Sequence, residues 1–178
     1  IVQDKSKLDI PATRDMLARW LDTDFYRFTK ERQYKDIPRK IIAEEVIPTA
    51  SGQPPFDYKL HCFNGKVRSI MVSIDRFTDH RRNYYDRDWN LQPFIFCVYR
   101  RLGKPKYPFG RDIAKPANLA KMIELAEKLS AGFKYLRVDL YTEAEKIYFG
   151  ELTFHHDSAW SRFNPAEWDH TWRQWLEE

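Results

Sequence analysis

Two carboxylates in the second half of the chain have the type and spacing of a charged site. Asp139 and Glu151 lie in neighbouring segments whose apolar side chains alternate. If the turn centres near residues 143–145, antiparallel pairing places Asp139 about opposite Glu151. Arg137, two residues before Asp139, then lies about opposite Thr153. Like charges facing each other across a sheet destabilise it by up to roughly 1 kcal/mol, so the pattern predicts that a cation binds here.

Two interpretations of this pair remain open from the spacing. Oxygen ligands at this distance suit Mg²⁺, which proteins commonly hold through one or two carboxylates together with water and phosphate oxygens. Alternatively, Arg137 neutralises both carboxylates and no metal binds. The spacing does not decide between them, because a register error of one residue would move Asp139 and Glu151 to opposite faces.

Other polar runs could also take part in chemistry. We expect the run 155–158, His-His-Asp-Ser, to be a loop that contacts substrate, with a structural histidine as the alternative. His61 and His80 are expected to be hydrogen-bonded residues of the surface or of a cleft. The basic runs at 80–82 and 100–101 are expected to be solvated loops.

Composition indicates one folded unit over residues 1–178. The chain has 43% hydrophobic, 31% charged and 16% aromatic residues, with a formal net charge of +4. This composition excludes intrinsic disorder, and no apolar run approaches the roughly 18 residues that cross a bilayer. The two cysteines fit neither a disulfide framework nor a zinc motif. We therefore expect a cytoplasmic protein.

Sequence patterns predict the elements that would position the site. Their order indicates an α+β fold with a largely antiparallel sheet. Asp9 is the expected N-cap of the first helix, and the last helix is expected to be capped near Asn164. The expected helices are 10–20, 116–131 and a last one from 164 onward; the expected strands are 39–47, 57–63, 66–76, 82–85, 135–141 and 146–154; and 86–115 is expected to be a long loop or lid.

The strand 57–63 is expected to have two different faces. Asn64-Gly65, which follows it, is typical of a tight hairpin turn. Because side chains alternate along a strand, Asp57, Lys59 and His61 share one face, which we expect to be reachable from solvent. The opposite face is expected to belong to the core.

The same segments resemble a known family. Arg137-Val138-Asp139 and Gly150-Glu151-Leu152-Thr153 resemble the paired metal-binding strands of the ATP-grasp fold, and 42–47 resembles its adenine-binding strand. The sequence as a whole is similar to that of the TupA-like ATP-grasp proteins over nearly its entire length. The similarity includes Asp57-Tyr58-Lys59, Phe63-Asn64-Gly65-Lys66, Asp75-Arg76-Phe77-Thr78, Trp89-Asn90, residues 124–129, residues 137–141, residues 149–154 and residues 165–169.

The resemblance implies an ATP-grasp-like α+β fold with a largely antiparallel sheet and flanking helices. It also implies that the N-terminal part of that fold is absent from this chain, because the family's phosphate-contacting lysine strand and glycine-rich loop would precede Ile1. We therefore expect the full-length protein to be an enzyme, and this chain alone to bind nucleotide weakly and to be inactive.

The activity that the resemblance implies is an ATP- and Mg²⁺-dependent ligation of a carboxylate to an amine through an acyl phosphate. Asp139, Glu151 and Thr153 would hold Mg²⁺, with Thr153 standing where many ATP-grasp enzymes have asparagine. Arg137 would stabilise negative charge on the acyl phosphate or the tetrahedral intermediate.

The resemblance also assigns residues to the nucleotide and the substrate. Lys59 and Arg76 would contact phosphate groups or the substrate carboxylate, and Asp57 would accept the ribose hydroxyls. The residues that would line the adenine are Glu44, Glu45, Val46 and Ile47.

The implied partners are small-molecule carboxylates and amines or sugars, in the synthesis of a cell-surface polysaccharide or teichuronopeptide-type polymer. A second hypothesis is a non-catalytic module that uses the basic excess to bind phosphate, in nucleic acid or in a nucleotide sugar. Of these two ligands, nucleic acid is the less expected.

Overall fold

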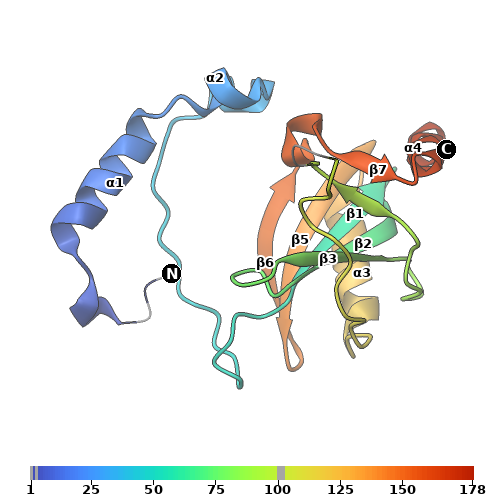
Figure 1. The fold of residues 1–178 in the computed structure, drawn as a ribbon, viewed down its shortest axis with the longest axis horizontal. Helices are drawn as coiled ribbons and strands as arrows, with labels where there is room; N and C mark the ends of the chain where they lie inside the picture. Colours follow the sequence, from blue (N-terminus) through green and yellow to red (C-terminus); the bar gives the residue numbers. More distant parts are fainter. Residues whose placement is uncertain (1, 3, 100–102) are drawn as a thin grey trace. The chain divides into compact units, whose positions relative to one another are not determined.

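The computed structural model describes residues 2, 4–99 and 103–178 (Figure 1). The chain divides into two compact units, Ile1–Pro48 and Thr49–Glu178. Helices and antiparallel strands occur together, as expected for an α+β fold. The expectation of a single unit over residues 1–178 stays a prediction.

The first unit contains short helices and no strand among its described residues. Asp9 caps the first α-helix as predicted, because its carboxylate accepts a hydrogen bond of 2.9 Å from the amide of Ala12. The strand predicted at 39–47 is wrong, since these residues belong to no helix or sheet. Alternating apolar residues favour a strand only where a partner strand completes the hydrogen bonds. The helical elements are η1 (Lys5–Lys7), α1 (Ile10–Asp22), α2 (Phe25–Thr29) and η2 (Arg32–Lys35).

The second unit is built on a five-stranded antiparallel sheet with the order β3-β2-β1-β5-β6. The predicted hairpin turn at Asn64-Gly65 is confirmed, and both residues have the positive φ that such turns require, 50° and 76°. The second predicted hairpin is also confirmed. The strands are β1 (Asp57–Phe63), β2 (Lys66–Ile74), β3 (Arg81–Tyr85), β5 (Tyr135–Glu143) and β6 (Lys146–Thr153).

One face of the sheet packs against α3 (Leu119–Ser130) and forms the larger hydrophobic cluster. The helix lies along the sheet in Figure 1. The residues that the helix buries are Leu119, Met122, Ile123, Ala126 and Ser130, whereas Leu129 is 40% exposed. The cluster contains Tyr58, Leu60, Cys62, Val67, Ile70, Val72, Ile74, Tyr85, Ile113, Leu119, Met122, Ile123, Ala126, Leu136, Val138 and Leu140.

The opposite face is partly covered by a layer of aromatic side chains. This cover comes from a two-stranded sheet, β4 (Ile95–Cys97) with β7 (Arg162–Asn164), and from α4 (Glu167–Glu177). The predicted cap at Asn164 is wrong, because this residue pairs with Ile95 in the small sheet and α4 begins later. The cluster under this cover contains Phe63, Met71, Tyr84, Phe94, Phe96 and Trp172.

The long connection at 86–115 contains β4 and two isolated bridges, Tyr85 with Leu91 and Tyr99 with Pro105. Its proposed action as a lid stays a prediction. The basic pair Arg100-Arg101 lies outside the described residues.

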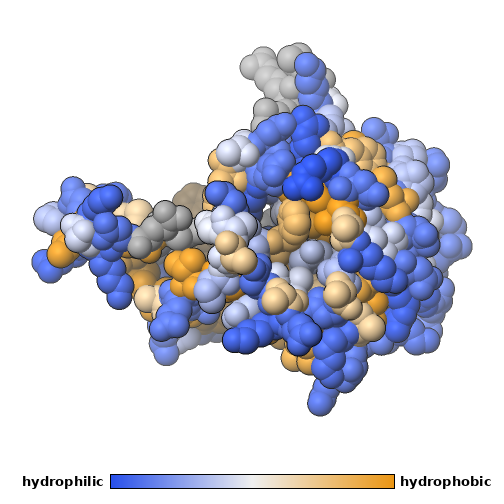
Figure 2. Space-filling model, turned by 90° about the horizontal axis from the view of Figure 1, so that it is seen from below, coloured by the Kyte–Doolittle hydropathy of each residue, from blue (hydrophilic) through white to orange (hydrophobic). Residues whose placement is uncertain are grey.

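Hydrophilic side chains predominate on the face shown in Figure 2, and hydrophobic side chains form separate areas between them. In the described part of the chain, every helix is too short or too polar to span a membrane.

Candidate functional site

The polar face of the sheet carries two neighbouring rows of charged side chains. Lys59 pairs with Asp139 between β1 and β5, and Asp139 pairs with Glu151 between β5 and β6. The next row contains Arg137 opposite Thr153, as predicted. The predicted register of the second hairpin is therefore confirmed at these pairs.

Arg137 joins three of the predicted side chains into one network. Its Nε donates to Asp139 Oδ1 over 2.7 Å, and its Nη2 donates to Asp139 Oδ2 over 2.8 Å. The same Nη2 donates to Glu151 Oε1 and to Thr153 Oγ1, both over 2.9 Å. A guanidinium fork thus lies between the two carboxylates that the sequence places opposite each other.

Lys59 and Arg76 extend this network towards the end of β1. The ammonium of Lys59 donates to Asp139 Oδ2 and lies 3.0 Å from Asp57 Oδ2. Arg76 Nη1 donates to the same Asp57 oxygen over 3.0 Å. The second oxygen, Asp57 Oδ1, is buried and has no hydrogen-bond partner among the described residues. Three cations and three carboxylates, counting Glu151, therefore balance in charge.

Most of this network is withdrawn from solvent. Asp57 is 2% exposed, Asp139 1% and Arg137 9%. The expected reachable face is therefore wrong for β1. In β1, Asp57 and Lys59 form an ion pair. The aromatic layer covers the other end of the strand, at His61 and Phe63. Burial lowers the pKa of Arg137, but the adjacent Asp139 outweighs it and leaves the pKa raised. Glu151 marks the open side, since 63% of its side chain is exposed.

Mg²⁺ can bind at this site only if Asp139 exchanges a cationic side chain for the metal. The donors Asp139, Glu151 and Thr153 are oxygen ligands of the kind that Mg²⁺ takes. However, the described residues contain no cluster of three or more acidic, histidine or cysteine side chains able to hold a metal. Both carboxylate oxygens of Asp139 accept hydrogen bonds from Arg137 or Lys59, which is the arrangement expected if Arg137 neutralises the carboxylates. A metal could bind Asp139 only if Arg137 or Lys59 moved to another anion.

The predicted adenine-lining residues are not in the sheet. They belong to the first unit, where they lie outside helices and strands. Of the four, Glu44, Glu45 and Val46 are exposed, and Ile47 is intermediate. Their role in nucleotide binding stays a prediction.

A buried chain of hydrogen bonds next to Arg137 was missed from the sequence. Tyr135 Oη lies 2.8 Å from His61 Nδ1 and 2.8 Å from His156 Nδ1. His61 is hydrogen-bonded as expected, but its expected place at the surface or in a cleft is wrong, because it is 1% exposed. His156 is hydrogen-bonded as a structural histidine would be. A detectable signal was that Tyr135 and His61 share the face of the predicted site residues.

His61 and His156, the two histidines hydrogen-bonded to Tyr135, favour the neutral form. Burial lowers the pKa of His156 to about 4, and the positive charge of Arg137 acts in the same direction. Burial also holds the pKa of His61 well below its usual value, with a smaller effect from His156. The hydrogen bonds to Tyr135 thus provide a neutral, polar boundary beside the ion-pair network.

Comparison with known proteins identifies a family. A family model described as TupA-like ATPgrasp matches residues 1–175. No curated protein and no solved structure gives a significant match.

Proposed function

Because the chain belongs to the TupA-like ATP-grasp family, we propose that its residues take part in the ATP- and Mg²⁺-dependent chemistry of a carboxylate–amine ligase. The observation that carries this proposal is the ion-pair network on the polar face of the sheet. It holds carboxylates and cations side by side, at the strand positions that resemble the metal-binding strands of the fold.

The network is suited to an exchange of partners with a nucleotide. Arg137 and Lys59 neutralise Asp139. A triphosphate would offer these cations phosphate oxygens, which form strong bidentate pairs with guanidinium groups. The oxygens of Asp139 would then be available to a metal. We therefore propose that Mg²⁺ and ATP bind together and that each binds weakly without the other.

Each residue has a role in this proposal. Asp139, Glu151 and Thr153 hold Mg²⁺, which when bound neutralises charge on the phosphates. Arg137 lies on the same face and contacts the acyl phosphate. A carboxylate oxygen of the substrate attacks the γ-phosphorus of ATP and releases ADP. The amine nitrogen then attacks the acyl carbon, loses a proton and displaces phosphate.

The remaining roles concern orientation of the nucleotide. Lys59 and Arg76 bind phosphate or substrate carboxylate oxygens. Asp57 accepts the ribose hydroxyls, and its buried unpartnered oxygen Oδ1 supports an acceptor role. The adenine is assigned to Glu44, Glu45, Val46 and Ile47.

The family also supports a proposal for the biological setting. We place the ligation in the synthesis of a cell-surface polysaccharide or teichuronopeptide-type polymer, with small carboxylate and amine or sugar substrates. A cytoplasmic location agrees with two buried cysteines that are both free.

Glu151→Gln tests the proposal with little risk to folding, because this side chain is largely exposed. Calorimetric titration of ATP should show binding that needs Mg²⁺, and the variant should weaken it about tenfold, or about 1.4 kcal/mol. Binding of ATP without Mg²⁺ should not change. Glu124→Gln is the matched control, since Glu124 is exposed on α3 and pairs only with Lys121 among the described residues.

An equal affinity of Glu151→Gln and the unchanged chain for ATP with Mg²⁺ would contradict the metal role. If binding of polyanions then fell steeply with salt in both, the non-catalytic phosphate-binding module would be supported. Asp139→Asn is a second variant, with its unfolding temperature measured because Asp139 is buried and paired.

A further inference from the structure

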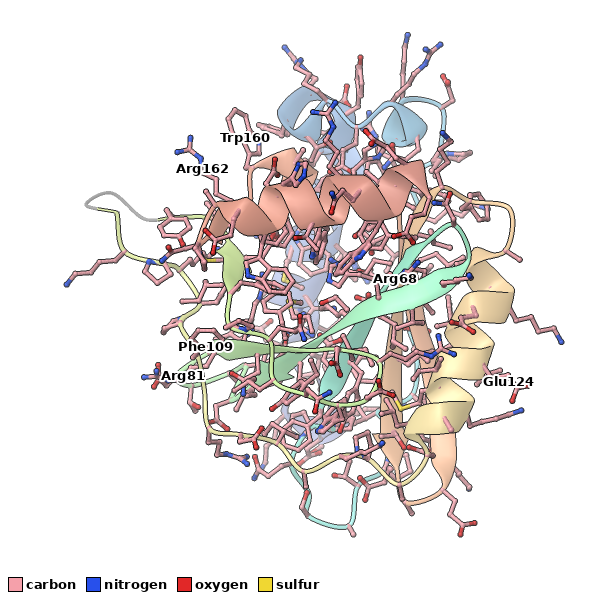
Figure 3. All side chains as sticks on the ribbon, turned by 90° about the vertical axis from the view of Figure 1, so that its right-hand side faces the viewer. Arg68, Arg81, Phe109, Glu124, Trp160 and Arg162 are labelled. Carbon is pink, nitrogen blue, oxygen red and sulfur yellow. The ribbon has the colours of Figure 1, made fainter. Side chains whose placement is uncertain are left out.

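Arg82 lies beside the proposed active site but takes no part in its ion-pair network. It pairs with Ser73, and Ser73 pairs with Asp57. These residues share one face, so Arg82 lies two strand spacings, roughly 10 Å, from Asp57. The expected solvated loop is wrong here, because only 11% of the Arg82 side chain is exposed. Its neighbour Arg81 points outward beside Phe109 (Figure 3).

The guanidinium of Arg82 is held in place but incompletely paired. The ring centroid of Tyr107 lies 3.8 Å from Cζ, and the backbone amide of Arg82 donates to Pro108 over 3.0 Å. Its Nη1 lies 3.5 Å from Asp157 Oδ2, which is long for a charged pair. Its buried Nε has no acceptor among the described residues. In Arg137, by contrast, the corresponding Nε and Nη2 both donate to one carboxylate.

The surroundings of Arg82 favour a single negative charge. Lys106 Nζ lies 5.1 Å from the centroid of the same Tyr107 ring. His80 packs on this ring at 4.4 Å, and burial, assisted by Arg82, lowers its pKa to about 4, so it is neutral at pH 7. Asp157 is the acid opposite Arg82. Burial raises its pKa, but a hydrogen bond of 2.6 Å from Ser161 and the charge of Arg82 leave it lowered.

We propose that Arg82, stacked on Tyr107, binds a non-reacting carboxylate group of the substrate, and that Asp157 occupies this position until substrate displaces it. The identification of the ligand as substrate rests on the proposed function. A guanidinium edge matches the two oxygens of a carboxylate. Because Asp139 and Arg137 lie on β5, three strand spacings or roughly 14 Å from β3, the group bound at Arg82 is not the one that reacts.

A carboxylate fits this subsite better than a phosphate. The group that faces Arg82 is itself a carboxylate. Arg82 and Lys106, with Asp157 beside them, carry a net charge of +1, which matches a carboxylate and not a phosphate dianion. The inferred substrate is therefore a small molecule with a second acid group, such as a dicarboxylic acid or an amino acid that retains its carboxylate.

Two substitutions at this pair should change the affinity in opposite directions. The whole chain is titrated with glutarate, without nucleotide or Mg²⁺, and binding is followed by calorimetry or NMR. Arg82→Gln should weaken binding at least tenfold. Asp157→Asn should tighten it several-fold, because the competing charge is lost. Asparagine also tolerates the φ of 49° at this position and can still accept from Ser161.

Asp79→Asn is the matched control, since it removes the same charge from an exposed residue that pairs with Arg81. It should bind glutarate as the unchanged chain does. Weaker binding by both Arg82→Gln and Asp157→Asn would overturn the proposal and indicate a purely structural pair. Equal affinity for glutarate and inorganic phosphate would overturn the assignment to carboxylate.

The outcome can be separated from that of the proposed function. Glu124→Gln should leave glutarate binding unchanged, because Glu124 lies on α3, which packs against the other face of the sheet. If ATP and Mg²⁺ fail to bind while the opposite effects at Arg82 and Asp157 are seen, the subsite stands and the ligase proposal fails. If glutarate does not bind to the unchanged chain at millimolar concentration, the subsite is refuted.

Discussion

Arg137 determines the state of the two carboxylates beside it. Its guanidinium contacts Asp139, Glu151 and Thr153 together. Removing one partner of a buried ion pair commonly costs 3–5 kcal/mol, since the other charge is left uncompensated. The same residue that would stabilise the reaction intermediates therefore also stabilises the folded sheet, and its substitution would confound activity with stability. Exposed Glu151 is the cleaner probe.

The neutral histidines beside Arg137 predict a dependence of stability on pH. His156 has a pKa of about 4 when folded, below its usual value near 6.5. Between these values the unfolded chain binds a proton that the folded chain does not, so stability falls as the pH falls. From pH 7 to pH 5 the loss should be about 2 kcal/mol for His156. Urea unfolding at several pH values measures it.

His156→Gln should flatten this dependence by about the same amount, whereas His155→Gln, at an exposed neighbouring position, should follow the unchanged chain. Parallel curves for the unchanged chain and His156→Gln would show that the buried chain through Tyr135 does not exclude protons. The test is confined to pH 5–7 so that titration of carboxylates contributes little.

For individual residues, the sequence predicted which side chains lie opposite each other better than it predicted their ionic partners and burial. The register of Asp139 with Glu151 followed from alternation and a short turn, both of which are local. Whether Arg137 or a metal neutralises the pair depends on rotamers and burial, which the pattern does not contain. Arg82 was misjudged for the same reason, because Tyr107, which covers it, comes from a distant part of the chain.

Among the elements, β6 contains a β-bulge that determines how Glu151 lies opposite Asp139. Asp139 pairs with Glu151 and Leu140 with Phe149, so Gly150 is the extra residue of a β-bulge. A Cβ on Gly150 would lie 3.0 Å from the carbonyl oxygen of Asp139 and 3.0 Å from the ring of Tyr141. The close approach of the two backbones therefore depends on glycine.

Gly150→Ala should disturb binding more than stability. The neighbouring backbone at Asp139 must move by a few tenths of an ångström, which displaces a proposed metal ligand. We expect weaker binding of ATP with Mg²⁺, by roughly tenfold, with about 1 kcal/mol lost in urea unfolding. Gly65→Ala, in the β1–β2 turn at φ 76°, should lose a similar stability without weakening binding. If Gly65→Ala weakened binding of ATP with Mg²⁺ more than Gly150→Ala did, this role of the bulge would be refuted.

Hairpins and helices were predictable where their signals are local. The Asn64-Gly65 turn is of this kind, and so is α3, which was expected at 116–131. The strand expected at 39–47 failed because pairing depends on a partner far along the chain. Burial of Asp57 and His61 was also missed, since neither the compensating ion pairs nor the aromatic cover can be read from β1 alone.

At the scale of the whole molecule, the two units differ in how much they bury. Every buried residue in the described chain belongs to Thr49–Glu178, which contains both hydrophobic clusters. The described residues up to Pro48 include none, although α1 has 13 residues. Isolated helices of this length are marginally stable in water, so most stability of such a helix would have to come from packing.

Hydrogen exchange of the intact chain should therefore separate the units. Amides of α1 should exchange with little protection, whereas those of β1, β2 and β5 should approach the global stability. Adding ATP with Mg²⁺ should raise protection at Glu44–Ile47 if these residues line the adenine, and Glu151→Gln should reduce that gain. Protection of α1 equal to that of β1 would contradict the first expectation. Unchanged exchange at Glu44–Ile47 under saturating nucleotide would remove the adenine role and confine nucleotide contacts to the polar face of the sheet.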